Sequence, residues 1–302
     1  MERIVFGDNQ FFGVNHMSEE KARAQAMRFQ DTAEIIRVLD IAYDSGMTAF
    51  MCTTHDRIAE ICAHVRANSE RYKEFTFYPC MPYAQKYANA VTENGVISAL
   101  AGMLPRDGAI NALFKGGMSI AKRDLAGIGE LLIDTEMRMF DGCRTPVVFL
   151  QNIVTDLLLG LKLHHLFRVF SDYVMRKHNA EAGFITMNMP MLLDALDEVE
   201  IDNPIVCSNI NKVGFRMCGG LAAYRHAIAN RRFRPVAMSV LASGAVPPRE
   251  AIEFIAGLRN VESVVFGAST RAHIEQTKGL LDEVFVGNRG NSKSSVSRDQ
   301  LM

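Results

Sequence analysis

Residues 234–244 read R-P-V-A-M-S-V-L-A-S-G, and residues 261–271 read V-E-S-V-V-F-G-A-S-T-R. Each stretch contains an apolar run of strand length, at residues 236–241 and 261–266. Apolar residues recur at helical spacing between the two runs, and a further helix pattern follows the second. Strands without polar alternation are typical of a parallel sheet that is buried on both faces. This part of the chain therefore predicts a strand–helix–strand–helix unit of an α/β protein.

The same alternation of strand and helix patterns runs through the whole chain. Further strands are predicted at residues 3–6, 48–52, 75–80, 146–151, 183–187 and 205–208. This order favours a single (β/α)8 TIM barrel, and a doubly wound open sheet is the alternative. An open sheet usually carries its glycine-rich phosphate loop after the first strand, where this chain has Gly7-Asp8-Asn9-Gln10 instead of G-x-G-x-x-G. We therefore predict one barrel over residues 1–286.

Local signals predict four details of this barrel. Asp31 is expected to cap a helix, with Glu34 completing a capping box. One long helix is expected at residues 155–177. Glycines and a proline interrupt residues 102–144, which we interpret as a helical insertion near the barrel mouth. The Gly-, Ser- and Asn-rich residues 287–302 predict a disordered tail.

The composition excludes several classes of protein. The formal net charge is −1, and without a basic excess a nucleic-acid partner is not expected. No apolar run reaches the ~18–20 residues of a membrane helix, so a membrane partner is not expected either. The six cysteines form no C-x-x-C motif and are interpreted as reduced thiols of a cytoplasmic protein. A small-molecule substrate is the expected partner, and the oligomeric state is left open.

Residues 237–244 (A-M-S-V-L-A-S-G) resemble the A-Y-S-P-L-x-x-G run that aldo-keto reductases carry on strand 7. Residues 267–276 are similar to the end of strand 8 and the following helix in that family. The resemblance implies an aldo-keto-reductase-like barrel and leaves NADPH as a candidate cofactor. In the family an Asn that ends strand 5 contacts the nicotinamide amide, and Asn188 occupies that position here. Asn209 occupies the strand 6 position of an amide or Tyr partner.

The catalytic positions of that family do not match this chain. The family's Asp and Tyr positions fall on Met51 and Asp56. Strand 3 ends without the family's Lys, and strand 4 ends in Leu150-Gln151-Asn152 without its His. The resemblance therefore does not carry the reductase activity with it, and NADPH-dependent reduction of general aldehydes is not expected.

Barrel enzymes place their chemistry at the carboxyl ends of the strands, so polar residues there are the catalytic candidates. His55 is the leading proton-transfer group because imidazole titrates near neutral pH, and Asp56 is its orienting carboxylate. His16 and Asp8 complete the predicted catalytic set. These groups lack H-x-H or H-x-x-x-H spacing, so no metal site is predicted. Alternatively, Asp56 caps a helix and His55 packs against its neighbours.

Other strand-end residues are predicted to bind the ligand. The substrate-binding candidates are Asn9, Gln10, Tyr83, Gln151, Asn188, Asn209, Lys212 and Arg216. Phosphate is expected at the turn after strand 8, where small residues and a helix N-terminus favour an anion. The phosphate-binding candidates are Ser239, Ser243, Gly267, Ser269, Thr270 and Arg271. Alternatively, the G-A-S turn only packs the last strand against its helix, and residues 209–216 form a polar surface loop.

Three functions remain open from the sequence. The leading hypothesis is a barrel enzyme that acts on a small anionic, phosphorylated or sugar-like substrate by acid–base chemistry, such as isomerisation, elimination or hydrolysis. The second is an NADPH-dependent oxidoreductase with a rearranged proton donor, Tyr78 or Tyr83. The third is a non-catalytic barrel that binds a ligand.

Overall fold

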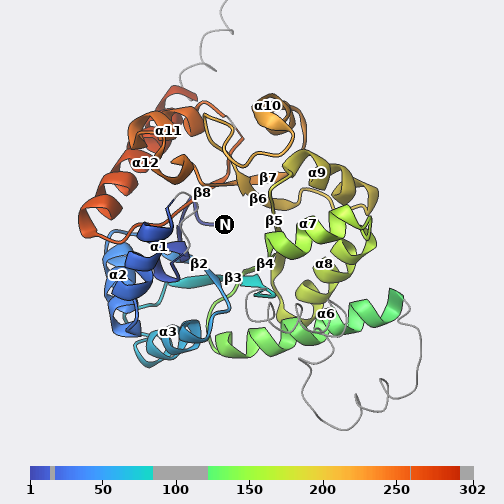
Figure 1. Ribbon diagram of the computed structural model, residues 1–302, viewed down its shortest axis with the longest axis horizontal. Helices are drawn as coiled ribbons and strands as arrows, with labels where there is room; N and C mark the ends of the chain where they lie inside the picture. Colours follow the sequence, from blue (N-terminus) through green and yellow to red (C-terminus); the bar gives the residue numbers. More distant parts are fainter. Residues whose placement is uncertain (14–17, 84–121, 259, 293–302) are drawn as a thin grey trace, which may run out of the picture. The chain divides into compact units, whose positions relative to one another are not determined.

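Eight parallel strands form a closed barrel in which they follow one another in chain order. The computed structural model describes residues 1–13, 18–83, 122–258 and 260–292 (Figure 1). The strands are β1 (Ile4–Gly7), β2 (Ala49–Thr53), β3 (Thr76–Met81), β4 (Val147–Leu150), β5 (Glu181–Thr186), β6 (Ile205–Asn209), β7 (Arg234–Met238) and β8 (Ser263–Phe266). The predicted TIM-barrel fold is confirmed, and every predicted strand is present with its ends shifted by a few residues.

Two compact units are distinguishable within the chain. The first comprises Met1–Met51, Met187–Pro190 and Ile205–Met302, and the second comprises Cys52–Thr186 and Met191–Pro204. The helices of the first unit are η1 (Asn9–Phe11), α1 (Glu19–Arg28), α2 (Thr32–Asp44), α10 (Gly220–Asn230), η3 (Ala242–Gly244), α11 (Pro248–Ala256) and α12 (Arg271–Ser292). Those of the second are α3 (Asp56–Ala67), α6 (Lys122–Met137), η2 (Arg138–Phe140), α7 (Asn152–Gly160), α8 (His165–His178) and most of α9 (Met189–Glu198). None of these described helices is both long and apolar enough to cross a membrane.

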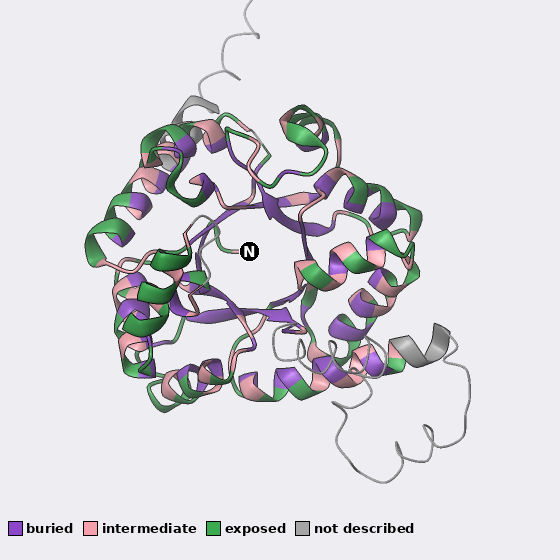
Figure 2. Ribbon diagram, viewed as in Figure 1, coloured by how far each residue is buried: buried purple, intermediate pink, exposed green. Residues whose placement is uncertain are grey.

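The strands in each unit are buried along most of their length, whereas the helices alternate between buried and exposed residues (Figure 2). All four residues of β1, β4 and β8 are buried. This is the pattern of a barrel strand, which has interior side chains on one face and helices on the other.

In the first unit, β1 pairs with β2 and β8, and β7 pairs with β6 and β8. Buried phenylalanines hold the first loop against these strands. The ring of Phe11 lies 5.0 Å from that of Phe29, and the ring of Phe6 lies 5.9 Å from that of Phe266. Phe6 and Phe11 are themselves 6.1 Å apart. Aromatic packing therefore fixes the start of the loop that follows β1.

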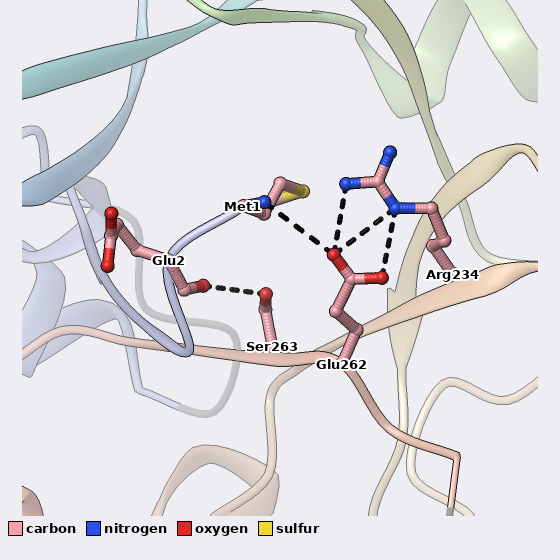
Figure 3. Close-up of polar contacts among 5 residues, drawn as sticks. All are labelled: Met1, Glu2, Arg234, Glu262 and Ser263. Atoms are coloured by element: carbon pink, nitrogen blue, oxygen red, sulfur yellow. Dashed lines mark hydrogen bonds and ion pairs between the residues drawn. The ribbon is translucent and has the colours of Figure 1, made fainter.

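Polar contacts join the amino-terminal ends of β1, β7 and β8 (Figure 3). The Nε of Arg234 lies 2.9 Å and 3.2 Å from the two carboxylate oxygens of Glu262. The Met1 amino group lies 3.6 Å from the same carboxylate, and the Ser263 hydroxyl donates to the Glu2 carbonyl at 2.7 Å. Burial raises the pKa of Glu262, but the hydrogen bonds and charge of Arg234 outweigh it and lower that pKa below its usual value. These contacts stabilise the strand ends that lie away from the predicted ligand-binding loops.

In the second unit, β4 pairs with β3 and with β5. Helices α7 and α8 pack against β5, and α6 packs against α8 (Figure 1). The ring of Phe184 on β5 lies 5.7 Å from that of Phe167 and 5.9 Å from that of Phe170, both on α8. These rings form the aromatic core between α8 and the strands.

The prediction of one long helix at residues 155–177 is wrong. Two helices, α7 and α8, occupy this region, and Lys162 between them has a left-handed conformation with φ +53°. A left-handed residue cannot continue a right-handed helix. Gly160 is the last residue of α7, and glycine costs a helix interior about 1 kcal/mol relative to alanine. The apolar pattern runs across this break, which is why it does not reveal the break.

Three other local predictions concern the start of α2, the end of α12 and residues 102–144. Asp31 caps α2 as predicted, because its Oδ1 accepts a hydrogen bond from the Ala33 N–H at 2.9 Å. Glu34 forms an ion pair with Arg37 instead of completing a capping box. The tail predicted from residue 287 overlaps the end of α12, which continues to Ser292, and residues 293–302 lie outside the described residues. Helix α6 and η2 lie within residues 102–144, where an insertion was predicted in addition to the helix between β3 and β4, and residues 102–121 lie outside the described residues.

The sequence does not predict α1. Its residues, E-E-K-A-R-A-Q-A-M-R, are almost all polar or small and form no apolar stripe. Helix α1 instead contacts the η1 turn of the loop that follows β1. This contact, rather than periodicity, accounts for a helix at this position.

Candidate functional site

A buried carboxylate, Glu136, joins the loops that follow β2 and β3 in the second unit. Glu136 is only 2% exposed. The Thr54 hydroxyl donates a hydrogen bond to its Oε2, and the Tyr83 N–H lies 3.2 Å from Oε1 and 3.1 Å from Oε2. A buried carboxylate is tolerated when hydrogen-bond donors surround it. Glu136 therefore fixes the backbone next to both Thr54 and Tyr83.

His55 and Tyr83 lie next to each other on these loops, with ring centroids 6.0 Å apart. His55 is the N-cap of α3, because its Nδ1 accepts a hydrogen bond from the Arg57 N–H at 3.2 Å. This bond assigns the proton of the neutral imidazole to Nε2, which is then the ring atom that can donate a proton. The cap is thus His55 rather than Asp56, whose side chain is exposed at the start of the helix. The His55–Tyr83 pair is the strongest acid–base candidate of the second unit.

The second tyrosine considered from the sequence, Tyr78, is less suited to proton transfer. It lies within β3 rather than at its end, is almost completely buried, and its ring packs 6.4 Å from that of Phe149. Gln151 does follow a strand, is partly buried, and donates its backbone N–H to the Met81 carbonyl at 2.9 Å. Of these two residues, only Gln151 remains a ligand-binding candidate.

Sequence reasoning missed the two carboxylates that support these strand ends. Thr186, at the end of β5, donates to Oδ1 of Asp156 on α7 at 2.5 Å, much as Thr54 donates to Glu136. A signal for Glu136 was present in the sequence. It lies three and four residues after Ile133 and Leu132, on the buried face of α6. A carboxylate on an apolar helix face indicates a buried partner.

In the first unit, Tyr224 of α10 fixes the loop that carries Asn188. Tyr224 is fully buried, and its hydroxyl donates to the Met187 carbonyl at 2.8 Å and accepts from the Met189 N–H at 3.1 Å. The Ser208 hydroxyl on β6 lies 3.2 Å from the same oxygen. Asn188 itself is partly exposed. Its side chain is therefore carried on a fixed backbone just beyond β5.

The two asparagines after β6 make structural contacts. Asn209 is buried, and its Nδ2 donates to the Arg216 carbonyl at 3.0 Å and lies 2.8 Å from Sδ of Met187. Asn211 is fully buried and exchanges two hydrogen bonds with the backbone of Phe215, at 2.8 Å and 2.9 Å. Both amides therefore hold the loop together, which favours a structural role over the ligand contact predicted for Asn209.

The two cations of this loop, Lys212 and Arg216, were predicted to bind the substrate. Lys212 forms an ion pair with Glu250 of α11, and both side chains are about half exposed. Arg216 is exposed, and its guanidinium lies 5.7 Å from the centroid of the Phe215 ring. Because an ion pair holds Lys212, whereas the Arg216 guanidinium lies beside an aromatic ring, Arg216 remains the better ligand-binding candidate.

Gln10 packs against the turn that follows β8. Its Nε2 donates to the Gly7 carbonyl at 2.8 Å, and a Cβ atom at position 267 would lie 2.0 Å from its Oε1. Any larger residue at position 267 would require the Gln10 side chain to shift. Gly267 therefore packs against Gln10 of the first loop, a contact that the sequence did not predict, and its phosphate-binding role stays a prediction.

Left-handed backbone conformations characterise the loop after β7. Ser239, Ala242 and Ser243 have φ values of +53°, +46° and +57°. Ala242 is fully buried and packs with Val246 and Ala251. A left-handed conformation costs a non-glycine residue about 1–2 kcal/mol, and such residues cluster where the backbone contacts a ligand. This loop is consequently a candidate ligand-binding segment.

Two arginines flank the start of α12. Thr270 caps this helix, because its Oγ1 accepts a backbone N–H of the first turn at 3.3 Å. The Nη2 of Arg28, from α1, donates to the Ser269 carbonyl at 2.7 Å. Arg271 is exposed and pairs with Glu275 one turn later at 3.0 Å. A helix N-terminus with two guanidinium groups beside it favours an anion.

The remaining predicted residues are distributed over both units. Asp8 is buried and Asn9 exposed in the first unit, next to Gln10. His16 lies outside the described residues. In the described ranges, no group of three His, Cys, Asp or Glu side chains is placed to hold a metal ion. Of the predicted catalytic set, His55 lies beside a second group that can transfer a proton, Tyr83.

No protein-family model and no curated protein matches this chain, but solved structures match its fold. A protein from Pseudomonas aeruginosa, provisionally described as an aldo-keto reductase, has a TM-score of 0.60 at 14% identity, over 94% of this chain and 91% of its own. A protein provisionally described as 2,5-diketo-D-gluconic acid reductase B has a TM-score of 0.52 at 10% identity, over 95% and 86%. The chain therefore has an aldo-keto-reductase-like barrel fold.

Proposed function

We propose that the protein is an oxidoreductase that uses NADPH to reduce a carbonyl group of a small molecule. The observation that carries this proposal is the start of α12, where Arg28 and Arg271 flank a capped helix N-terminus. On a barrel with this fold, a nucleotide phosphate is the anion that best fits a helix start after the last strand. The structural relatives described as reductases support this choice over isomerisation, elimination or hydrolysis of a phosphorylated substrate.

The first unit supplies the residues that would hold the cofactor. Thr270, the N–H groups of the first turn of α12, Arg28 and Arg271 would bind a phosphate group. Asn188, on the backbone that Tyr224 fixes, would hydrogen-bond the nicotinamide amide. NADPH supplies a hydride when bound. The guanidinium and N–H groups suit the phosphates of a dinucleotide, and the Asn188 amide suits its nicotinamide.

The second unit supplies the proton donor. The family's catalytic positions are occupied by Met51 and Asp56, so the donor must be a different group. Tyr83, which is 7% exposed and has its N–H bound by Glu136, is the first choice, and Nε2 of His55 is the group beside it that could return the proton. Within the second unit, Tyr83 could give up a proton that His55, which is partly exposed, would restore from solvent.

Carbonyl-dependent oxidation of NADPH, measured over a panel of small aldehydes, ketones and keto sugars, tests the activity. Tyr83→Phe is expected to lower kcat by about tenfold or more, since general acid catalysis contributes at least that much, and to leave NADPH affinity unchanged. His64 and Tyr72 of the same unit are a matched control pair, with Nε2 of the histidine 3.1 Å from the tyrosine hydroxyl. Tyr72→Phe is expected to keep full activity. Equal rates for Tyr83→Phe and wild type would reject Tyr83 as the proton donor. If no compound of the panel is turned over, the proposal that the protein is a reductase would be rejected.

A further inference from the structure

Two cysteines of the second unit, Cys62 and Cys143, are neighbours although they lie 81 positions apart in the chain. Cys62 is on α3 and fully buried, whereas Cys143 follows η2 and is partly exposed. The Sγ of Cys143 lies 4.0 Å from the Cys62 carbonyl oxygen, so the two residues are in contact. One thiol of the pair is therefore accessible to reagents and the other is shielded behind it.

Arg66 places a positive charge beside the accessible thiol. It lies one helical turn after Cys62, on the same side of α3. Its Nη1 lies 3.6 Å from Sγ of Cys143 and donates to the carbonyls of Met139 at 3.1 Å and Asp141 at 2.9 Å. A single guanidinium thus fixes the backbone before Cys143 and contacts its sulfur.

The turn that presents Cys143 is a tight one. The Cys143 N–H donates to the Phe140 carbonyl at 2.8 Å, Asp141 has φ −53° and ψ 126°, and Gly142 has φ +77°. These are the angles of a type II turn, which needs glycine at its third position. The thiol is consequently held in a defined position rather than on a free loop.

The charges around the pair separate the roles of the two sulfurs. The hydrogen bond from Cys62 and the guanidinium of Arg66 together outweigh burial and lower the pKa of Cys143 to about 7. The same hydrogen bond, together with burial, raises the pKa of Cys62. At neutral pH about half of Cys143 is therefore thiolate, while Cys62 keeps its proton. A low-pKa accessible thiol beside a second cysteine is the arrangement of redox-reactive pairs.

We propose that Cys143 and Cys62 form a peroxide-reactive pair that closes into a reversible disulfide. The Cys143 thiolate attacks an oxygen of hydrogen peroxide; the S–O bond forms as the O–O bond breaks, the sulfur loses two electrons, and the departing hydroxide takes a proton to become water. The Cys62 sulfur then attacks the Cys143 sulfur, so that the S–S bond forms as the S–O bond breaks. The hydroxide that leaves takes the Cys62 proton and becomes a second water. A dithiol reductant restores both thiols.

Peptide mapping by mass spectrometry tests the pair in the full-length protein. After brief treatment with hydrogen peroxide and alkylation of the remaining thiols, a Cys62–Cys143 disulfide is expected as the main product, and dithiothreitol should remove it. Cys218, an exposed thiol of the first unit, is the internal control and should oxidise several-fold more slowly. Oxidation of Cys218 at the same rate, or a peroxide-treated protein without the Cys62–Cys143 link, would overturn the proposal.

Two further measurements separate the roles of the cysteines. In Cys62→Ala the oxidation of Cys143 should stop at a sulfenic acid that dimedone traps, and in Cys143→Ser no oxidation of Cys62 should occur. In wild type, the rate at which iodoacetamide alkylates Cys143 should rise with pH around a midpoint of about 7. A midpoint at about 8.5 or above, the value of an ordinary thiol, would show that Cys143 is not activated and would reject the pair.

Discussion

Replacement of Gly267 by alanine tests the packing at the end of β8. The added Cβ would lie 2.0 Å from Oε1 of Gln10 and 2.8 Å from its Cδ, so the amide must move. Gln10 is 5% exposed and donates to the Gly7 carbonyl at 2.8 Å, and a shift of the amide is expected to weaken or break this buried bond. The lost hydrogen bond and the overpacking together should lower the free energy of unfolding by about 1–3 kcal/mol.

A double-mutant cycle of Gly267→Ala and Gln10→Ala, measured by urea unfolding, tests this explanation directly. Gln10→Ala alone removes the same hydrogen bond and should cost about 1–2 kcal/mol. In the double variant the new methyl group occupies space that the glutamine has left, so the two losses overlap by about 1 kcal/mol or more. Effects that add within about 0.5 kcal/mol would refute the packing explanation. Weaker anion binding by Gly267→Ala at unchanged stability would refute it as well, in favour of the phosphate-binding role.

Three further changes test other parts of the structure. Glu136→Gln should lower the free energy of unfolding by about 1–3 kcal/mol, because a neutral amide is a weaker acceptor than a carboxylate and its NH2 group would replace one of the two oxygens that the Tyr83 N–H faces; an unchanged urea midpoint would contradict this. Thr270→Ala should cost about 1 kcal/mol through the lost cap of α12, and a thermal melt identical to wild type would contradict it. The pKa of Glu262 is lowered from 4.5 in the folded protein. The carboxylate therefore contributes its full stabilisation above pH 4.5, and this stabilisation disappears as the pH falls through the lowered pKa of the folded protein. The stability advantage of wild type over Glu262→Gln should therefore shrink below about pH 4.5, and an advantage that is constant with pH would contradict it.

The strands and their order could be predicted because each strand is short, apolar and separated from the next by a helix pattern. The Asp31 cap could be predicted for a similar reason, since its hydrogen bond reaches only two residues along the chain. Signals of this kind depend on neighbours in sequence, and the barrel is built from many of them. The break between α7 and α8 escaped prediction because Gly160 alone does not interrupt an apolar pattern that continues on both sides.

The side-chain contacts of the candidate site depend on residues that are distant in sequence. The Tyr83 N–H meets a carboxylate 53 positions later, and Arg28 reaches the Ser269 carbonyl 241 positions away. Periodicity places Glu136 on a buried helix face but does not say which donor it meets. For the same reason Asn209 was predicted to bind ligand, because the sequence does not show that its amide is taken up by Arg216 and Met187.

Binding of NADPH to purified protein, followed by fluorescence titration, tests the proposed function most directly. Arg28→Ala and Arg271→Ala should each weaken binding by about tenfold or more, the size of one lost charged hydrogen bond, and NADH should bind less tightly than NADPH. Arg249, an exposed arginine of α11 that pairs with Glu283, is the matched control, and Arg249→Ala should leave the Kd unchanged. A saturable NADPH signal with this order of affinities is the predicted result. No saturable binding, or an equal loss in Arg249→Ala, would contradict the proposal that the start of α12 holds the phosphate of a nicotinamide cofactor.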